Sequence, residues 1–198
     1  MKLNTFEKFI VNSSVRFWVQ NLIEMPTLMS MFAQPPQSPT SVLEIGCGYG
    51  NGIEVIKRHL NPEHITAIDF DDEMVTATRK RFLGSNHITI KQADAAQLPF
   101  ENEQFDMVFE FAVFHHVPDW QKAVQEVYRV LKPNGYFVVE DLYRSAICNP
   151  ISKRLFEHPQ TNRFDHSELV VQLVDSGFKI IEDKHFLNLL GAVVVQKI

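Results

Sequence analysis

The chain has 198 residues, a hydrophobic content of 45% and a formal net charge of −5 at pH 7. This length is sufficient for one hydrophobic core, and the composition is ordinary for a globular domain. The negative charge disfavours a dedicated nucleic-acid binder, which needs clustered Lys and Arg to neutralise phosphates. The two cysteines supply neither a disulfide framework nor a metal quartet, and no signal peptide or transmembrane run is evident, so we expect a cytoplasmic domain.

The first section of the chain is predicted to be helical. Apolar residues recur at mostly helical spacing over residues 3–33, with breaks near residues 12–14 and at Pro26, and prolines in residues 34–39 end the segment. We expect residues 1–39 to form a helical lid or extension and residues 40–198 to form the main domain. In a lid, Phe17 and Trp18 would contact the substrate; packing on the core and contact with a membrane surface are the alternatives.

A glycine-rich run follows the first predicted strand, which covers residues 41–46. Its glycines occupy every second position: Gly46, Gly48, Gly50 and Gly52. Glycine accepts φ > 0 and lets a ligand approach the backbone closely at the end of such a strand. The dinucleotide pattern G-x-G-x-x-G/A does not fit, because Asn51 and Ile53 stand at its third small position. Glu44, inside the strand, favours a ligand with a cationic end, such as S-adenosylmethionine, over a pyrophosphate; a turn without a ligand is the alternative.

Strands and helices alternate through the rest of the chain, which is typical of a doubly wound parallel α/β sheet. The predicted elements are helix 52–60, strand 64–69, helix 72–83, strands 87–93 and 105–111, helix 119–131, strand 135–142, helix 166–176 and strands 178–188 and 191–197. Asp69 and Asp94 lie at the ends of the second and third strands. Carboxylates there can accept hydrogen bonds from ribose hydroxyls and an adenine amino group, although NAD sites use a similar acid and Asp94 also suits a helix N-cap.

Five segments together resemble class I S-adenosylmethionine-dependent methyltransferases of the type 11, or ubiquinone/menaquinone-biosynthesis-like, group. The segments are residues 42–50, 65–74, 92–100, 105–119 and 129–139, in the order found in that family. The resemblance implies a Rossmann-like, mostly parallel seven-stranded sheet with an antiparallel last strand, plus N-terminal helices. It also implies methyl transfer from S-adenosylmethionine to a small, apolar or aromatic molecule, with S-adenosylhomocysteine as the product. Asn134 replaces a family glycine, and we expect the turn to survive because Asn tolerates a left-handed conformation.

The resemblance further implies which residues hold the cofactor. Glu44 and the backbone of Gly46 and Gly48 would hold the methionine moiety, with Cys47 as a small side chain of the loop. Asp69 would bind the ribose hydroxyls and Phe70 would lie beside the adenine. The other predicted cofactor-binding residues are Met74, Asp94, Ala95, Glu110 and Phe111.

His115 and His116 are the candidate catalytic residues, because a histidine at the end of the fourth strand can remove a proton from the methyl acceptor. A structural role is the alternative for both, and we expect no metal site. Tyr143 is predicted to form a wall of the substrate pocket. The basic residues of the following connection indicate either an anionic substrate or a solvated loop; they are Arg144, Lys153, Arg154 and Arg163.

The expected partner is a small-molecule substrate, and the chain is expected to be a monomer or a homodimer. Two other functions remain open at this point. One is a catalytically silent S-adenosylmethionine-binding homologue that acts as a partner or regulator, and the other is an NAD-dependent oxidoreductase.

Overall fold

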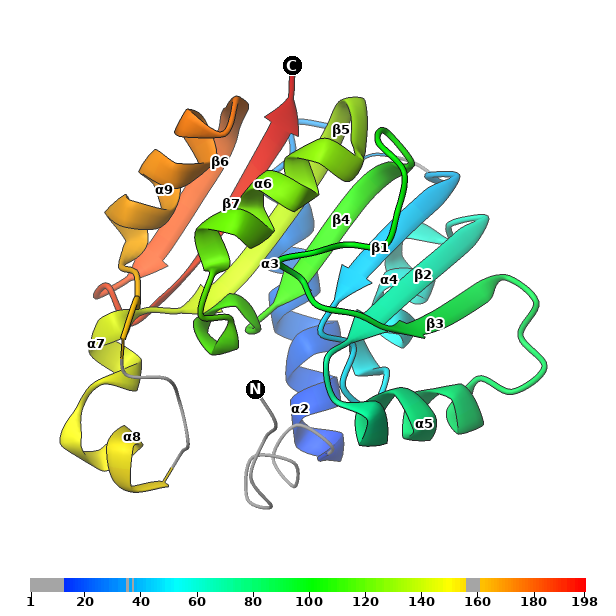
Figure 1. Ribbon diagram of the computed structural model, residues 1–198, viewed down its shortest axis with the longest axis horizontal. Helices are drawn as coiled ribbons and strands as arrows, with labels where there is room; N and C mark the ends of the chain where they lie inside the picture. The colour runs from blue at the N-terminus through cyan, green and yellow to red at the C-terminus, as the bar shows by residue number, and fades with distance from the viewer. Residues whose placement is uncertain (1–12, 35, 37, 156–160) are drawn as a thin grey trace.

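The computed structural model describes residues 13–34, 36, 38–155 and 161–198. Its centre is a seven-stranded sheet, as predicted, and the strand order is β3-β2-β1-β4-β5-β7-β6 (Figure 1). The strands are β1 (Ser41–Ile45), β2 (His64–Asp69), β3 (Ile88–Gln92), β4 (Phe105–Phe111), β5 (Leu131–Leu142), β6 (Phe178–Phe186) and β7 (Leu190–Lys197). The strands from β1 to β5 pair in parallel, and β7 inserts antiparallel between β5 and β6.

Helices cover both faces of the sheet (Figure 1). One face packs against α6 (Trp120–Val130) and α9 (His166–Asp175), and the other packs against α3 (Met25–Met29), α4 (Asn51–Leu60) and α5 (Asp72–Arg81). Successive strand residues divide between the two cores, as the two-residue period of a β-strand requires. For example, Leu43 belongs to the core under α6, whereas Val42 belongs to the core under α4.

The N-terminal segment differs from the single broken helix that its sequence predicts. Within the described part, helix α2 (Ser14–Val19) continues into a π-helical turn, η1 (Gln20–Glu24), and then into α3. Ser13 caps α2 by accepting a hydrogen bond from the Arg16 amide at 3.1 Å, which agrees with a break near residues 12–14. The irregular turn precedes Pro26, which has no backbone N–H to donate. Residues 1–12 of the predicted helix lie outside the described residues.

The connection after β5 contains two short helices that the sequence did not predict, α7 (Arg144–Ile147) and α8 (Pro150–Leu155). A further short helix, η2 (Phe114–His116), follows β4. Asn134 has a φ of 65°, so the left-handed turn expected at this position is present. None of the helices in the described ranges has the length and apolar character needed to cross a bilayer.

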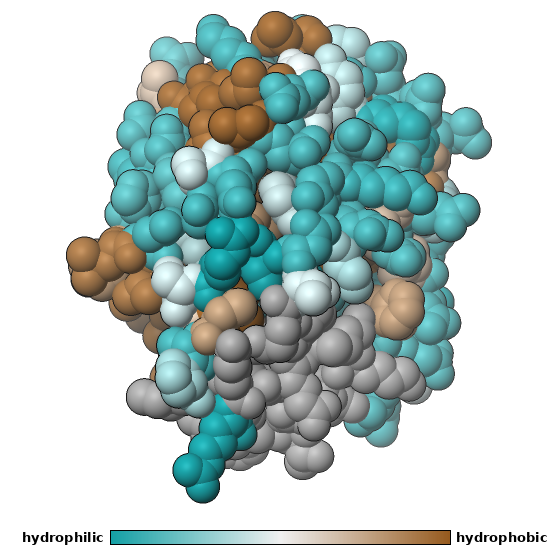
Figure 2. Space-filling model, turned by 60° about the vertical axis from the view of Figure 1, so that its left-hand side comes forward, coloured by the Kyte–Doolittle hydropathy of each residue, from teal (hydrophilic) through white to brown (hydrophobic). Residues whose placement is uncertain are grey.

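The face in Figure 2 is mostly hydrophilic, and its apolar residues form separate patches.

Candidate active site

A cavity of about 580 Å³ lies at the carboxyl ends of β1, β2, β3 and β4. Its lining comes from the segments that follow these strands, and the lining residues that the sequence predicted are Gly46, Gly48, Asp69, Phe70, Met74, Asp94, Ala95, Phe111 and His116. A volume of this size at the strand ends of an α/β sheet is typical of a small-molecule site.

The glycine loop is held in place by backbone contacts. Gly46 and Gly48 have φ values of 74° and 50°, in the left-handed region that favours glycine. The Gly46 and Cys47 amides both donate to the Ile68 carbonyl, at 2.8 and 2.9 Å. Thr78 Oγ1 donates to the Gly48 carbonyl at 2.6 Å. Cys47 is buried behind the loop and does not line the cavity, and this burial raises the pKa of its thiol.

Asp69 joins the glycine loop to the turn after β2. Its Oδ2 accepts a hydrogen bond from the Gly48 amide at 2.8 Å, and its Oδ1 accepts one from the Asp71 amide at 2.9 Å. Burial raises the pKa of Asp69, while the two backbone hydrogen bonds favour the ionised form. The carboxyl group therefore lies in the cavity wall with its orientation already fixed.

Asp94 occupies the wall beside Ala95. Its Oδ1 accepts a hydrogen bond from the Ala96 amide at 2.9 Å, so it also stabilises a local turn. Asp94 was also a candidate for a helix N-cap. Its side chain does cap a turn, but no helix begins there. Phe70 is half exposed at the cavity rim, whereas Met74 and Phe111 are buried in the lining.

Two predicted acids lie behind the cavity wall. Glu44 is 2% exposed and packs against Gly52, because strand alternation turns it to the α4 side while Ile45 lines the cavity. Burial and then the nearby Asp69 raise the pKa of Glu44 well above its usual value. Glu110 accepts hydrogen bonds from the Val113 and Phe114 amides and so fixes the start of the loop after β4. Burial also raises the pKa of Glu110.

The two histidines have different positions. His116 lines the cavity, whereas His115 is 3% exposed and does not. The ring of His115 contacts the Asp141 carboxyl group through Nδ1, and its centroid lies 4.1 Å from that of His116. Burial raises the pKa of Asp141 to about 8, although the backbone hydrogen bonds and the Arg163 guanidinium act in the opposite direction. The sequence reasoning missed Asp141, although an acid near the end of a central strand is a recognisable signal.

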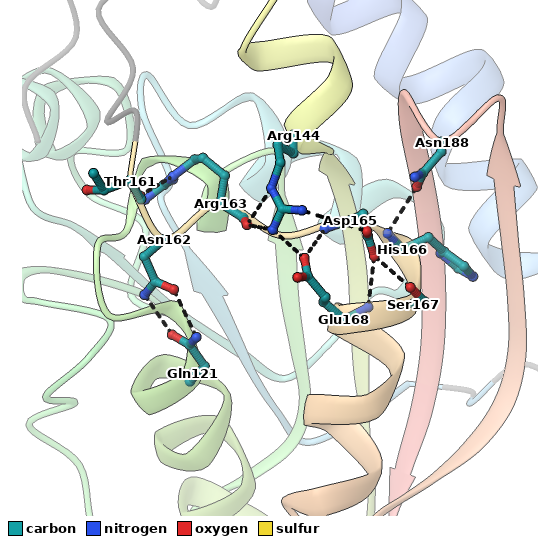
Figure 3. A network of polar contacts seen from close by, with 10 residues as sticks. All are labelled: Gln121, Arg144, Thr161, Asn162, Arg163, Asp165, His166, Ser167, Glu168 and Asn188. Atoms are coloured by element: carbon teal, nitrogen blue, oxygen red, sulfur yellow. Dashed lines mark hydrogen bonds and ion pairs between the residues drawn. The ribbon is translucent and has the colours of Figure 1, made fainter.

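Arg163, from the connection between β5 and α9, holds the loop after β4 in place. Its guanidinium donates to the carbonyls of His115 and Val117, and this side chain is only 4% exposed. Asn162 adds a hydrogen bond to the Pro118 carbonyl at 2.6 Å and a reciprocal amide pair with Gln121 (Figure 3). Because residues 116–119 line the cavity, residues 161–163 brace one of its walls.

The basic side chains that the structure describes in the 143–166 connection do not form one anion site. Arg144 pairs with Glu168 at 2.6 Å and donates to the Arg163 carbonyl (Figure 3). Arg154 is exposed on α8, and the Lys153 side chain lies outside the described residues. The solvated-loop interpretation fits Arg154, but Arg144 and Arg163 bind protein groups.

Three predicted substrate contacts do not line this cavity. Tyr143 is fully buried and its hydroxyl contacts His166 Nδ1 at 2.8 Å, so it packs inside the domain instead of forming a pocket wall. Phe17 and Trp18 form an edge-to-face pair with centroids 5.5 Å apart. Trp18 is 52% exposed to solvent.

A family model described as a methyltransferase domain matches residues 43–139, which include the glycine loop, Asp69, Asp94 and the histidines. The chain contains a methyltransferase domain. Its sheet order and its antiparallel β7 are those of the class I fold. A solved S-adenosylmethionine-dependent methyltransferase from Aquifex aeolicus has the same fold, with a TM-score of 0.77 over 100% of both chains and 18% identity.

Two curated relatives resemble the methyltransferase domain in sequence. A phthiotriol/phenolphthiotriol dimycocerosates methyltransferase from Mycobacterium tuberculosis is 36% identical over 51% of this chain and 37% of its own length. A fatty-acid O-methyltransferase from Mycolicibacterium smegmatis is 34% identical over 57% of this chain and 40% of its own length. This chain therefore matches less than half of the length of these relatives.

S-adenosylmethionine is the cofactor that this methyltransferase domain and its fold imply. The cavity fits the chemistry of that molecule. It offers backbone groups in a glycine loop, the half-buried Asp69 carboxyl group at the end of β2 and the apolar side chains of Phe70 and Met74. Within the described ranges no cluster of three or more His, Cys, Asp or Glu is placed to hold a metal ion.

Proposed function

We propose that the chain is an S-adenosylmethionine-dependent methyltransferase that acts on a small lipophilic molecule. The observation that carries the proposal is one cavity in which the glycine loop and Asp69 meet His116. Asp69 would accept hydrogen bonds from the ribose hydroxyls, and the backbone of Gly46 and Gly48 would hold the methionine end. Phe70, Met74, Asp94 and Ala95 would surround the adenine.

The cofactor, when bound, supplies a sulfonium methyl group for in-line transfer to the acceptor. Such a displacement depends mainly on alignment of the two reactants. His116 would face the acceptor and take the proton that the acceptor loses when the new bond to carbon forms. Asp141 would act through His115 as a positioning residue, because it holds both the ring and the backbone of that histidine.

The lipophilic character of the acceptor is supported by two observations. The names of the curated relatives refer to a dimycocerosate lipid and to fatty acids. The cavity wall after β4 is also largely apolar, with Val113, Val117 and Pro118. An apolar wall favours acceptors that gain free energy by leaving water.

Calorimetric titration tests the cofactor part of the proposal. S-adenosylhomocysteine should bind, and Asp69→Ala should lower its affinity by about ten- to a hundredfold, because two hydrogen bonds to a carboxyl group are lost. Asp72→Ala, an exposed acid of α5, is the matched control and should change little. Binding of NADH in place of S-adenosylhomocysteine would contradict the proposal.

Turnover then separates an enzyme from a silent homologue. A panel of fatty acids, long-chain alcohols and aromatic hydroxyl compounds would be incubated with S-adenosylmethionine, and release of S-adenosylhomocysteine would be measured. We expect release with at least one lipophilic member and loss of turnover in His116→Ala. Cofactor binding without turnover on a broad panel would instead favour a regulatory role.

A further inference from the structure

The helical segment formed by α2 and η1 presents apolar side chains to solvent. We call these residues the apolar stripe; their exposed fractions are 72% for Val15, 52% for Trp18, 36% for Val19, 63% for Leu22 and 61% for Ile23. They are separated by three, one, three and one positions, which places them along one side of a helix. The stripe is therefore a continuous surface, unlike the isolated apolar residues that are normal on a soluble domain.

The opposite side of the same segment faces the domain and is polar except for Phe17, which packs against the core. Gln20 and Asn21 are 4% and 9% exposed, and Arg16 forms a partly buried ion pair with Glu24. His59 of α4 contacts the Asn21 carbonyl at 3.2 Å. A surface helix usually buries its apolar side. Here the arrangement is inverted, so the stripe contributes nothing to the core and suits an apolar environment outside the domain.

Basic residues lie beside the segment. Lys57, Arg58 and His59 are consecutive and exposed in the last turn of α4. The Arg58 guanidinium lies 5.2 Å from the centroid of the Phe17 ring, which fixes this basic turn next to α2. An apolar helix side that contains Trp, flanked by basic residues, is the combination that inserts at the boundary between lipid headgroups and acyl chains. Basic side chains also attract anionic headgroups.

We infer that the apolar stripe and the basic turn dock on the surface of an anionic lipid bilayer. A second copy of the chain would bring another set of the same basic residues to the contact, whereas anionic lipid supplies the complementary charge. Glu24, which pairs with Arg16 in this segment, lies close enough to Glu140 to raise its pKa, so the segment lies beside the carboxyl end of β5. Docking would thus bring the end of the sheet that holds the cavity to the lipid surface. The inference goes beyond methyl transfer and does not require it.

Vesicle binding tests the inference without cofactor or acceptor, so its outcome is independent of turnover. The probe is vesicles of phosphatidylcholine with or without phosphatidylglycerol. The chain has two tryptophans, and Trp120 is buried, so a blue shift of the fluorescence on binding would report Trp18. We expect binding that increases with phosphatidylglycerol and weakens with salt.

Variants of exposed residues identify the surface. Leu22→Ser/Ile23→Ser should lower vesicle binding by about tenfold or more, because two apolar side chains no longer enter the lipid. The matched control is Val171→Ser/Val174→Ser, which removes two exposed apolar residues of α9 and should leave binding unchanged. Lys57→Glu should weaken binding to anionic vesicles, whereas Lys179→Glu on β6 should not. Thermal unfolding confirms that each variant is folded.

Three results would overturn the inference. The first is a wild-type chain that does not bind anionic vesicles, and the second is an α9 control that loses as much binding as the stripe variant. The third is a wild-type dimer in analytical ultracentrifugation that becomes a monomer in Leu22→Ser/Ile23→Ser while neither protein binds vesicles. That result would assign the stripe to a second copy of the chain.

Discussion

The Asp141 carboxyl group contacts His115 twice: one oxygen is hydrogen-bonded to the ring Nδ1, and the other accepts from the backbone amide at 3.0 Å. The pair lies under His116, the histidine in the cavity wall. A buried carboxyl group that holds both the ring and the main chain of one residue restricts the orientation of the whole η2 turn.

We expect Asp141→Asn to lower kcat of methyl transfer by about ten- to a hundredfold, because the NH2 group of Asn replaces one of the two oxygens that contact His115 and cannot accept a hydrogen bond. KM for S-adenosylmethionine should change little, since Asp141 does not line the cavity. Steady-state kinetics measure both constants. Asp175→Asn, at the exposed end of α9, is the control. An equal loss in cofactor binding would show that Asp141 supports the fold of the site in general.

Arg163→Lys should lower the free energy of unfolding by about 2–3 kcal/mol. A lysine cannot donate to two carbonyls with the planar geometry of a guanidinium, and its charge would remain buried. Arg144→Lys is the matched control in the same connection, and it should cost under about 1 kcal/mol because that side chain is exposed and ion-paired. Urea unfolding gives both values; equal losses would refute a special role for Arg163.

A comparison of Gly46→Ala with Gly84→Ala distinguishes the cost of backbone strain from the cost of a steric clash. Both glycines have positive φ, 74° and 87°, so an alanine is strained at either position. A Cβ at Gly46 would overlap Val113, whereas at Gly84 it would meet no atom within 4 Å. We expect a loss of about 1 kcal/mol for Gly84→Ala and at least about 2 kcal/mol more for Gly46→Ala. Thermal unfolding of both variants would show the difference, and similar losses would mean that Val113 moves aside.

The raised pKa of Glu140 predicts that the free energy of unfolding depends on pH. Burial, and then the nearby Glu24, raise the pKa of Glu140 from 4.5 to about 8. The folded chain therefore holds a proton that the unfolded chain releases between these two pH values. The contribution of Glu140 to the free energy of unfolding is fully present below about pH 4.5. It is lost as the pH rises toward 8, by up to about 1.4 kcal/mol per pH unit.

Chemical denaturation at several pH values tests this effect. In Glu140→Gln the decrease in unfolding free energy between pH 5 and 8 should be smaller than in the wild type, because a neutral amide does not titrate. Glu182→Gln, on the exposed side of β6, should follow the wild type. A Glu140→Gln profile parallel to the wild type would mean that Glu140 is ionised in the folded chain at neutral pH.

The sheet and the cofactor loop could be predicted because both are encoded locally. The alternation of strands and helices, the glycines after β1 and the acids at the ends of β2 and β3 are visible without knowledge of distant contacts. Asn134 is a similar case, since its left-handed turn depends on its own side chain.

The errors concern residues whose partners are distant in sequence. Arg163 binds carbonyls 48 and 46 positions away, so the charge pattern of its own segment could not show that it is a structural residue. Tyr143 follows a strand but turns inward to His166, 23 positions on. Glu44 is a different case: strand alternation turns its side chain toward α4 and Ile45 lines the cavity, while its role beside the methionine moiety stays a prediction.

The contacts of residues 161–163 make the 143–166 connection and the loop after β4 depend on each other, in engineered chains and in related natural ones. An exchange of the 143–166 connection between two homologues would break the bonds to the His115, Val117 and Pro118 carbonyls and the pairing with Gln121 unless the new segment restored them. Functional chimaeras should therefore need the connection and the loop after β4 to be inherited as one unit, and substitutions at Gln121 and Asn162 should arise together.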